Sequence, residues 1–348
     1  MRQLAKASNE KFLFLQLHIT GKCNLKCKHC YQTYYDKESL GVNEIEDIIN
    51  QFVVLSKQFN SKEKGQINLT GGEPFVRKDI FEILDLFEKN NQLINFALLS
   101  NGSLITDAIA EKLSKYRLSF IQLSLEGTEQ THDSIRGQGN FNTTINAIKI
   151  LRKHNIRVHV SFTANKVNYI EFPKVVQICE KLGVARVWSD RLIPIGQSTN
   201  NELSPLSPSD CMEFFKIIKR EQDILYNKNS MTEVWMKRAL QFIVSKKDIY
   251  QCSAGVSALS IDECGNVLPC RRMPIVCGNI LRDKLEDIYY NNPIFVDLRK
   301  KQVAEDCENC RFKYLCNGGA KCQSFAMYGD YHKADPFCPL VYYGLNSN

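Results

Sequence analysis

The chain has 348 residues, of which 44% are hydrophobic and 24% are charged, a composition typical of a globular protein with a full-sized core. No run of about 18 apolar residues occurs, and residues 1–8 (MRQLAKAS) lack the apolar core of a signal peptide, so we expect a cytoplasmic protein without a membrane span. The net charge of +7 is spread along the sequence and indicates a solvated surface, not a nucleic-acid site.

Apolar periodicity predicts strands that alternate with helices over the first 192 residues. Residues 12–20 alternate as in a strand, and residues 43–59 carry an apolar stripe at helical spacing. The pattern then repeats, with strands at 66–70, 95–99, 120–125, 157–163 and 185–192 and helices at 79–90, 107–116, 140–154 and 170–181. Six strands in βαβ order favour an α/β fold, an open partial (β/α)6 barrel whose functional residues gather at the carboxyl ends of the strands.

Polar segments follow these strands. Cys23, Cys27 and Cys30, at C-x3-C-x2-C spacing, come after the first strand. A four-iron cluster normally takes four Cys thiolates, so a loop with three leaves one iron open to an outside ligand; a partial zinc site is the alternative. The later strands are followed by the segments 70–74 (TGGEP), 100–102 (SNG), 124–127 (SLEG), 132–137 (HDSIRG), 163–165 (TAN) and 191–196 (RLIPIG).

The composition changes after the last of these strands. Residues 198–208 are rich in Ser, Thr, Asn and Pro and predict a linker, followed by helical patterns at 208–226 and 231–246. Nine of the fourteen cysteines lie between residues 252 and 338. We therefore expect a barrel domain at 1–197, a linker with bridging helices at 198–250 and a cysteine-rich domain at 251–348. A disulfide knot is the alternative, which a reducing compartment disfavours.

Together these motifs resemble the radical S-adenosylmethionine (SAM) superfamily, in the branch whose peptide-modifying maturases carry a C-terminal SPASM domain. The resemblance implies a SAM-binding [4Fe-4S] cluster on Cys23, Cys27 and Cys30. It assigns SAM contacts to Tyr31, Gly71, Gly72, Glu73, Pro74, Ser100, Asn101, Ser124, Glu126, Arg136, Thr163 and Arg191. Among these, the GGEP segment is expected at the amino group of SAM and Arg136 at its carboxylate, which a guanidinium binds with two hydrogen bonds. Relatives often carry Asp where Glu126 stands.

The same resemblance implies two auxiliary iron–sulfur clusters. One is expected on Cys307, Cys310, Cys316 and Cys338, and the other on Cys252, Cys270 and Cys322. Several relatives have a further Cys where this chain has Ala320, so Cys264 or Cys277 supplies the missing thiolate, or one iron stays open. Cys179 and Cys211 lie in helical patterns, where we expect buried, inert thiols.

The implied activity is that of a radical SAM oxidoreductase. It cleaves SAM reductively to a 5′-deoxyadenosyl radical and abstracts hydrogen from a substrate carbon, with a ribosomally synthesised peptide as the favoured substrate, which acquires a crosslink or other side-chain modification. Modification of a tetrapyrrole or haem precursor is the alternative. Sulfatase-type maturation ranks lower, because Arg271 stands where those relatives carry a catalytic Asp. A non-catalytic iron–sulfur carrier would have no use for the SAM motifs.

The resemblance also implies partners. An electron donor of the flavodoxin or ferredoxin type would reduce the clusters. Since the first strand begins near Phe12, a separate leader-binding carrier protein is expected, unless the barrel itself holds the leader. The basic pair Arg271 and Arg272 is a candidate attractor of an acidic peptide segment, although capping of nearby carboxylates would explain it as well. No general base is identified from the sequence.

Overall fold

The computed structural model describes residues 12–32, 40–200, 203–245, 249–300 and 302–344. The chain divides into two compact units. The first contains the described residues of 1–24, 34–121 and 253–300, and the second those of 25–33, 122–252 and 301–348. Both units therefore combine barrel segments with segments of the cysteine-rich region.

The first unit contains a sheet with the strand order β10-β9-β8-β1-β2-β3. Its strands are β1 (Phe14–His18), β2 (Gly65–Thr70), β3 (Ile94–Leu99), β8 (Ala258–Ile261), β9 (Asn266–Leu268) and β10 (Gly278–Asn279). β1 runs parallel to both β2 and β8, and β2 runs parallel to β3. β9 pairs antiparallel with β8 and with β10.

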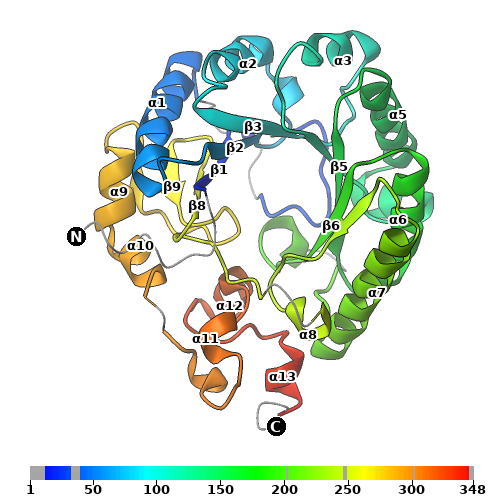
Figure 1. Cartoon of the computed structure of the whole chain (residues 1–348), viewed down its shortest axis with the longest axis vertical. Helices are drawn as coiled ribbons and strands as arrows, with labels where there is room; N and C mark the ends of the chain where they lie inside the picture. The colour runs from blue at the N-terminus through cyan, green and yellow to red at the C-terminus, as the bar shows by residue number, and fades with distance from the viewer. Residues whose placement is uncertain (1–11, 33–39, 201–202, 246–248, 301, 345–348) are drawn as a thin grey trace. The chain divides into compact units, whose positions relative to one another are not determined.

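The helices of this unit are amphipathic and cover the sheet. They are α1 (Val42–Phe59), α2 (Ile80–Lys89), α3 (Asp107–Leu113), α9 (Leu285–Asn291) and α10 (Pro293–Leu298). α1 and α2 lie along one face of β2 and β3 (Figure 1). Ile45, Ile48 and Phe52 of α1 are fully buried, as are Ile67 and Leu69 of β2, so the apolar stripe predicted for this helix forms the core.

The second unit contains the strands β4, β5, β6 and β7 in that order. Their bounds are β4 (Ile121–Ser124), β5 (Val158–Ala164), β6 (Arg186–Arg191) and β7 (Glu233–Trp235), and β5, β6 and β7 are parallel. The helices are α4 (Glu129–Arg136), α5 (Asn140–Lys153), α6 (Phe172–Lys181), α7 (Pro208–Asn227), α8 (Phe242–Ser245), α11 (Lys313–Cys316), α12 (Lys321–Tyr328) and α13 (Pro339–Tyr342). α5, α6 and α7 cover one face of β5 and β6 (Figure 1).

Parallel strands that alternate with helices confirm the α/β fold class expected from the sequence. The strands and helices predicted up to residue 192 agree with the structure to within a few residues. The segment 132–137, which contains Arg136, belongs to the helix α4 except for Gly137. Among the described residues, no helix is sufficiently long and apolar to cross a membrane.

The predicted helix at 231–246 is wrong. Residues 233–235 form β7, which pairs with β6, and only 242–245 are helical; residues 246–248 lie outside the described part. Val234 and Met236 are buried between more exposed neighbours, which is the alternation of a strand. Leu240 has a φ of 70°, a left-handed conformation that a continuous helix excludes.

Candidate active site

In the first unit, the two glycines of the GGEP segment lie against the chain that leads to Cys23. The backbone N–H of Gly72 donates to the carbonyl of Thr20 at 2.8 Å, and that of Glu73 donates to the carbonyl of Lys22 at 2.9 Å. A Cβ on Gly71 would approach the Thr20 carbonyl oxygen to 2.2 Å, and one on Gly72 would approach the Lys22 carbonyl oxygen to 2.1 Å. The close approach that these glycines permit is therefore to the cysteine loop.

Glu73 connects this segment to the end of β3. Its side chain is fully buried and accepts hydrogen bonds from the Ser100 hydroxyl at 2.9 Å and from the Asn101 backbone N–H at 2.7 Å. The side-chain amide of Asn101 donates to Asn24 Oδ1 at 3.0 Å and lies 3.9 Å from Cys23 Sγ. Glu73, Ser100 and Asn101, which the sequence assigned to SAM, thus form one network that reaches the first cysteine. Pro74 begins a short 3-10 turn whose Phe75 N–H also donates to Glu73.

In the second unit, α4 presents Arg136, and a neutral histidine fixes this helix. His132 Nδ1 accepts from the backbone N–H of Glu126 at 3.1 Å, while Nε2 lies 3.0 Å from Asn140 Oδ1. Burial, helped by the charge of Arg136, lowers the pKa of His132 to about 4. At neutral pH the ring therefore accepts at Nδ1 and donates from Nε2, which matches both contacts.

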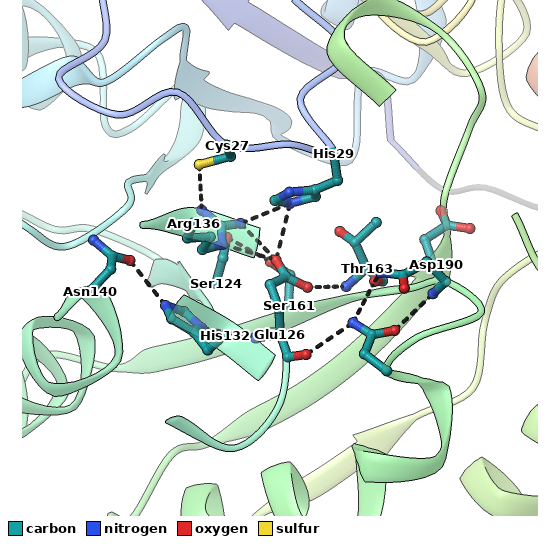
Figure 2. Close-up of polar contacts among 12 residues, drawn as sticks. Cys27, His29, Ser124, Glu126, His132, Arg136, Asn140, Ser161, Thr163 and Asp190 are labelled. Carbon is teal, nitrogen blue, oxygen red and sulfur yellow. Dashed lines mark hydrogen bonds and ion pairs between the residues drawn. The ribbon is translucent and has the colours of Figure 1, made fainter. Parts of the chain in front are cut away.

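Glu126 lies at the centre of the polar network in Figure 2. Its Oε1 accepts from Arg136 Nε at 3.1 Å and from Arg136 Nη2 at 2.7 Å, and lies 3.2 Å from His29 Nε2. Its Oε2 accepts from the backbone N–H of Thr163 at 2.7 Å. Burial alone would raise the pKa of Glu126, but Arg136 and His29 outweigh burial and hold this pKa well below its usual range. Glu126 is therefore a buried carboxylate.

The second and third cysteines of the motif lie in this unit as well. Cys27 and Cys30 are joined by a turn in which the Cys30 N–H donates to the Cys27 carbonyl at 3.1 Å. Arg136 Nη1 lies 3.8 Å from Cys27 Sγ, as Figure 2 shows. Gly196 packs against the backbone of Cys30 and Tyr31 in this turn. A Cβ added at Gly196 would lie only 2.3 Å from the Tyr31 carbonyl oxygen. Tyr31 and the segment after β6 are thus close together.

Ser124 and Arg191 complete the set of predicted SAM contacts. The Ser124 hydroxyl lies 3.3 Å from that of Ser161 on β5. Arg191, the last residue of β6, is buried and donates to both carboxylate oxygens of Asp335. Neither His29 nor Asp335 was identified from the sequence. His29 lies inside the cysteine motif and Asp335 is three residues before Cys338, so their positions beside expected ligands were the available signals.

Four C-terminal cysteines surround one cavity in the second unit. Cys307, Cys310, Cys316 and Cys338 line it together with apolar residues that include Phe312. Burial, with the nearby thiols of Cys338 and Cys310, raises the pKa of Cys307 to about 12. Four thiols on one cavity fit a four-iron cluster, which takes four Cys ligands and would deprotonate them on binding.

The remaining cysteines are distributed between the units. Cys252 and Cys322 belong to the second unit, and Cys264, Cys270 and Cys277 to the first. Burial raises the pKa of Cys277 to about 12. All fourteen cysteines are free thiols, so the disulfide knot considered above is not formed. Among the described residues, no group of three or more His, Cys, Asp or Glu side chains is arranged so that it could hold a single metal ion. Cys179 and Cys211 are fully buried in α6 and α7, as predicted.

Comparison with known families agrees with this geometry. The family model for the radical SAM superfamily matches residues 17–179, and that for an iron–sulfur cluster-binding domain, SPASM, matches residues 252–311. The chain is a radical SAM enzyme with a SPASM domain. The radical SAM domain implies a [4Fe-4S] cluster and SAM as cofactors, and the SPASM domain implies auxiliary iron–sulfur clusters.

The enzyme is similar to curated proteins over most of its length. An AdoMet-dependent heme synthase of Methanosarcina barkeri is 27% identical over 92% of this chain and 94% of its own. The mycofactocin maturase MftC of Mycobacterium tuberculosis is 25% identical over 93% of this chain and 82% of its own. The structure of Streptococcus suis SuiB bound to precursor peptide SuiA has a TM-score of 0.78, with 18% identity, over 97% of this chain and 78% of that one. The likeness to SuiB establishes the radical SAM fold.

Proposed function

We propose that this radical SAM enzyme modifies a side chain of a ribosomally synthesised peptide, by a crosslink or another bond at an unactivated carbon. When bound, SAM and the cluster on Cys23, Cys27 and Cys30 supply a 5′-deoxyadenosyl radical that abstracts hydrogen from the substrate. The chain's own residues hold the cysteine loop and position the substrate. The observation that carries the peptide assignment is the polar face of the β4–β6 sheet.

This face lies opposite the helices of the second unit. Phe162 of β5 packs against Phe172 of α6 and Phe214 of α7, so its neighbours Ser161 and Thr163 point to the other face. The register of β5 and β6 places Trp188 beside Ser161 and Asp190 beside Thr163. The helix-free face therefore carries hydroxyls, an indole and a carboxylate, all of them partly exposed.

β4 continues the same polar face. Ser124 contacts Ser161 across the strands, and Gln122, two residues earlier, accepts from the Trp188 indole N–H at 2.9 Å. Arg238 stacks on Trp188 with 4.3 Å between its guanidinium carbon and the ring centroid, and its Nε lies 3.6 Å from Asp190. Amide, hydroxyl and charged groups suit the backbone and polar side chains of a peptide, whose hydrogen-bonding groups need partners when they are desolvated.

Tetrapyrrole modification is the second candidate, and the similarity to the heme synthase of M. barkeri favours it. A porphyrin presents a broad, flat apolar ring, which binds best in a mostly apolar pocket. The polar face described above supports a peptide more strongly. Arg271 would attract the carboxylates of either substrate only weakly, because Glu263 and Asp262 offset its positive charge. Its guanidinium lies 3.4 Å from Glu263 and 3.9 Å from Asp262.

The proposal includes two partners. Reduction of the clusters calls for a donor of the flavodoxin or ferredoxin type, and delivery of the peptide calls for a leader-binding carrier protein or for leader binding by the barrel.

Sulfatase-type maturation would require a base at position 271. Arg271, which is paired with acidic neighbours, is not such a base.

The test uses two candidate substrates, one in co-expressing cells and one with purified enzyme under anaerobic conditions. The enzyme is co-expressed with a small peptide encoded next to its gene, and the peptide is weighed by mass spectrometry. A loss equal to two hydrogen atoms supports peptide modification, and the Cys27→Ala variant is the control that must leave the mass unchanged. The purified enzyme is also incubated with a carboxylated haem precursor, SAM and dithionite. An unmodified peptide together with a converted precursor would reverse the ranking of the two candidates.

A further inference from the structure

Both tryptophans of the chain lie against the guanidinium of Arg238. The guanidinium carbon is 4.3 Å from the ring centroid of Trp188 and 5.5 Å from that of Trp235. The two indoles are neighbours, because the pairing of β6 with β7 sets Trp188 beside Trp235. The N–H of the Trp188 ring donates to Gln122, which fixes the orientation of this ring. Arg238 is therefore held on the polar face of the β4–β6 sheet by rings whose positions the strands determine.

The backbone of Arg238 is anchored to β6 as well. Its N–H donates to Gln241 Oε1 at 3.1 Å, and the side-chain amide of Gln241 donates to the Ser189 carbonyl at 3.4 Å. Ala239, Leu240 and Gln241 are all buried, whereas the side chain of Arg238 is 23% exposed. The arginine thus extends from a packed segment and remains accessible to a ligand. A side chain that is already ordered loses little entropy when it binds one.

Arg238 lies beside the polar network of the site. Its neighbour Asp190 is paired in register with Thr163, whose N–H donates to Glu126 in that network (Figure 2). Thr163 and Asp190 are near the carboxyl ends of β5 and β6, which is the edge of a parallel sheet where ligands bind. A group bound by Arg238 would therefore be close to the reacting part of a substrate.

The hydrogen-bond donors of this guanidinium are poorly used within the protein. Nε lies 3.6 Å from Asp190 Oδ2, which is beyond hydrogen-bonding distance, and is buried without a hydrogen-bond partner. Among the described residues, the one acceptor of a hydrogen bond from its side chain is the Lys237 carbonyl, at a long 3.5 Å from Nη1. Stacking on a ring occupies the face of a guanidinium and leaves the N–H groups at its edge available to an acceptor.

Arg186 on the same face of β6 provides the contrast. It also stacks on an indole, at 4.8 Å from the ring centroid of Trp235. However, its Nε and Nη2 lie 2.9 and 2.8 Å from Glu233 Oε2, so a carboxylate of the protein already occupies its donors. The stacking of Arg238 is similar, but an equally close carboxylate is missing among the described residues.

We propose that Arg238 is a specificity-determining residue that binds a carboxylate of the substrate. A guanidinium binds a carboxylate through two parallel N–H···O bonds, and because Nε faces Asp190, Nη1 and Nη2 supply these donors in Arg238. This inference rests on the proposed function, since it names the chemical group by which the peptide is recognised on the polar face. The carboxylates of a haem precursor present the same chemistry, and the test therefore has an arm for each source.

The first arm couples Arg238 to a carboxylate of the peptide. The peptide encoded next to the gene is synthesised with each acidic side chain replaced in turn by its amide, and with its C-terminus amidated. Arg238→Gln should raise KM about tenfold or more, as expected for loss of a charged hydrogen bond, with little change in kcat. One peptide variant should raise the KM of the wild-type enzyme similarly and have no further effect on Arg238→Gln. Effects that add for every carboxylate would overturn the proposal.

The second arm separates this inference from the proposed function. The haem precursor is offered with its carboxylates free or as methyl esters. If the precursor is converted and the peptide is not, the proposed function fails, while a loss of activity on esterification that Arg238→Gln does not increase supports the carboxylate site. Additive effects of esterification and Arg238→Gln would overturn it.

Tryptophan emission gives a readout that needs no turnover. Both tryptophans of the chain contact Arg238, so a carboxylate bound there should change their emission. The probes are N-acetylglutamate N-methylamide and the corresponding glutamine compound, added to the reconstituted enzyme. The glutamate probe should act at concentrations about tenfold lower or less, and Arg238→Gln should abolish this difference. An equal response of the wild type to both probes would overturn the proposal.

Three further variants test the charge balance at Arg238. Asp190→Asn removes the carboxylate that offsets its charge and should strengthen binding of the glutamate probe. Arg186→Gln is the matched control: it also stacks on Trp235 but is paired with Glu233, so the preference for the glutamate probe should persist. Arg238→Lys keeps the charge and should retain part of this preference. If Arg238→Gln does not fold, Asp190→Asn decides, since an affinity that does not rise contradicts the proposal.

Discussion

Arg191 and Asp335 form a buried ion pair between the end of β6 and the C-terminal cysteine segment. Arg191 Nη1 and Nη2 donate to the two carboxylate oxygens of Asp335 at 3.0 and 2.6 Å, and the exposed side-chain fractions are 4% and 0%. Asp335 also accepts from the backbone N–H groups of Ala320 and Phe337, and its carbonyl accepts from that of Cys338. One carboxylate thus fixes the loop after Cys316 and the approach to Cys338.

Replacing Asp335 with Asn should destabilise the protein and the auxiliary cluster expected on Cys307, Cys310, Cys316 and Cys338. The variant leaves Arg191 buried without its charged partner, a change that typically costs about 3–5 kcal/mol. We expect a lower free energy of unfolding in urea and a loss of about four iron atoms per chain. Asp223→Asn, which removes an exposed pair with Lys219, is the matched control and should cost less than about 1 kcal/mol. Equal stability and iron content in the two variants would contradict the role given to Asp335.

Replacing Cys27 with Ala should abolish reductive cleavage of SAM. The variant lacks one of three proposed thiolate ligands, so dithionite-reduced protein should release no 5′-deoxyadenosine above background by liquid chromatography. Cys179→Ala is the control, because this thiol is buried inside α6 and should not affect cleavage. Release at the wild-type level from the Cys27 variant would refute its assignment.

The iron content should divide between the two cysteine groups. Three four-iron clusters correspond to about 12 iron atoms per chain after anaerobic reconstitution. Removing Cys23, Cys27 and Cys30 together should leave about eight, held by the C-terminal cysteines. Colorimetric iron analysis measures both values. An iron-free triple variant would exclude the C-terminal cysteines as cluster ligands.

Gly72→Ala should disturb the cysteine loop. Its new Cβ would lie 2.1 Å from the Lys22 carbonyl oxygen, a backbone atom that cannot move away without displacing the chain next to Cys23. We expect a weaker electron paramagnetic resonance signal from the reduced cluster that SAM perturbs, with the auxiliary clusters retained. In Gly41→Ala the nearest atom to the Cβ would be a Glu44 side-chain oxygen at 3.6 Å, so this variant should keep the full signal. The same loss in both variants would show that the clash at Gly72 is not the cause.

The periodicity of the sequence predicted most of the α/β framework, because the apolar pattern of an amphipathic helix or strand is visible within a short stretch of consecutive residues. Helix 43–59 and the strand containing Leu15 and Leu17 are examples whose buried residues match the pattern. The family was also identified from short segments, since the spacing of Cys23, Cys27 and Cys30 and the GGEP segment are local features. The local apolar pattern predicted a helix at residues 233–235, but these residues form a strand because they pair with β6.

Only the tertiary structure decided what the polar residues of the site contact. Arg136 and Cys27 are 109 positions apart in the sequence, and Arg191 and Asp335 are 144 apart. The sequence predicts that both arginines contact SAM, and it does not reveal the protein partners that the structure gives them, Glu126 for Arg136 and Asp335 for Arg191. A side chain's partner depends on which distant segments the fold brings within hydrogen-bonding distance, and no local periodicity encodes that choice. The sequence thus determined the framework and the family, and long-range packing determined the partners of the charged groups.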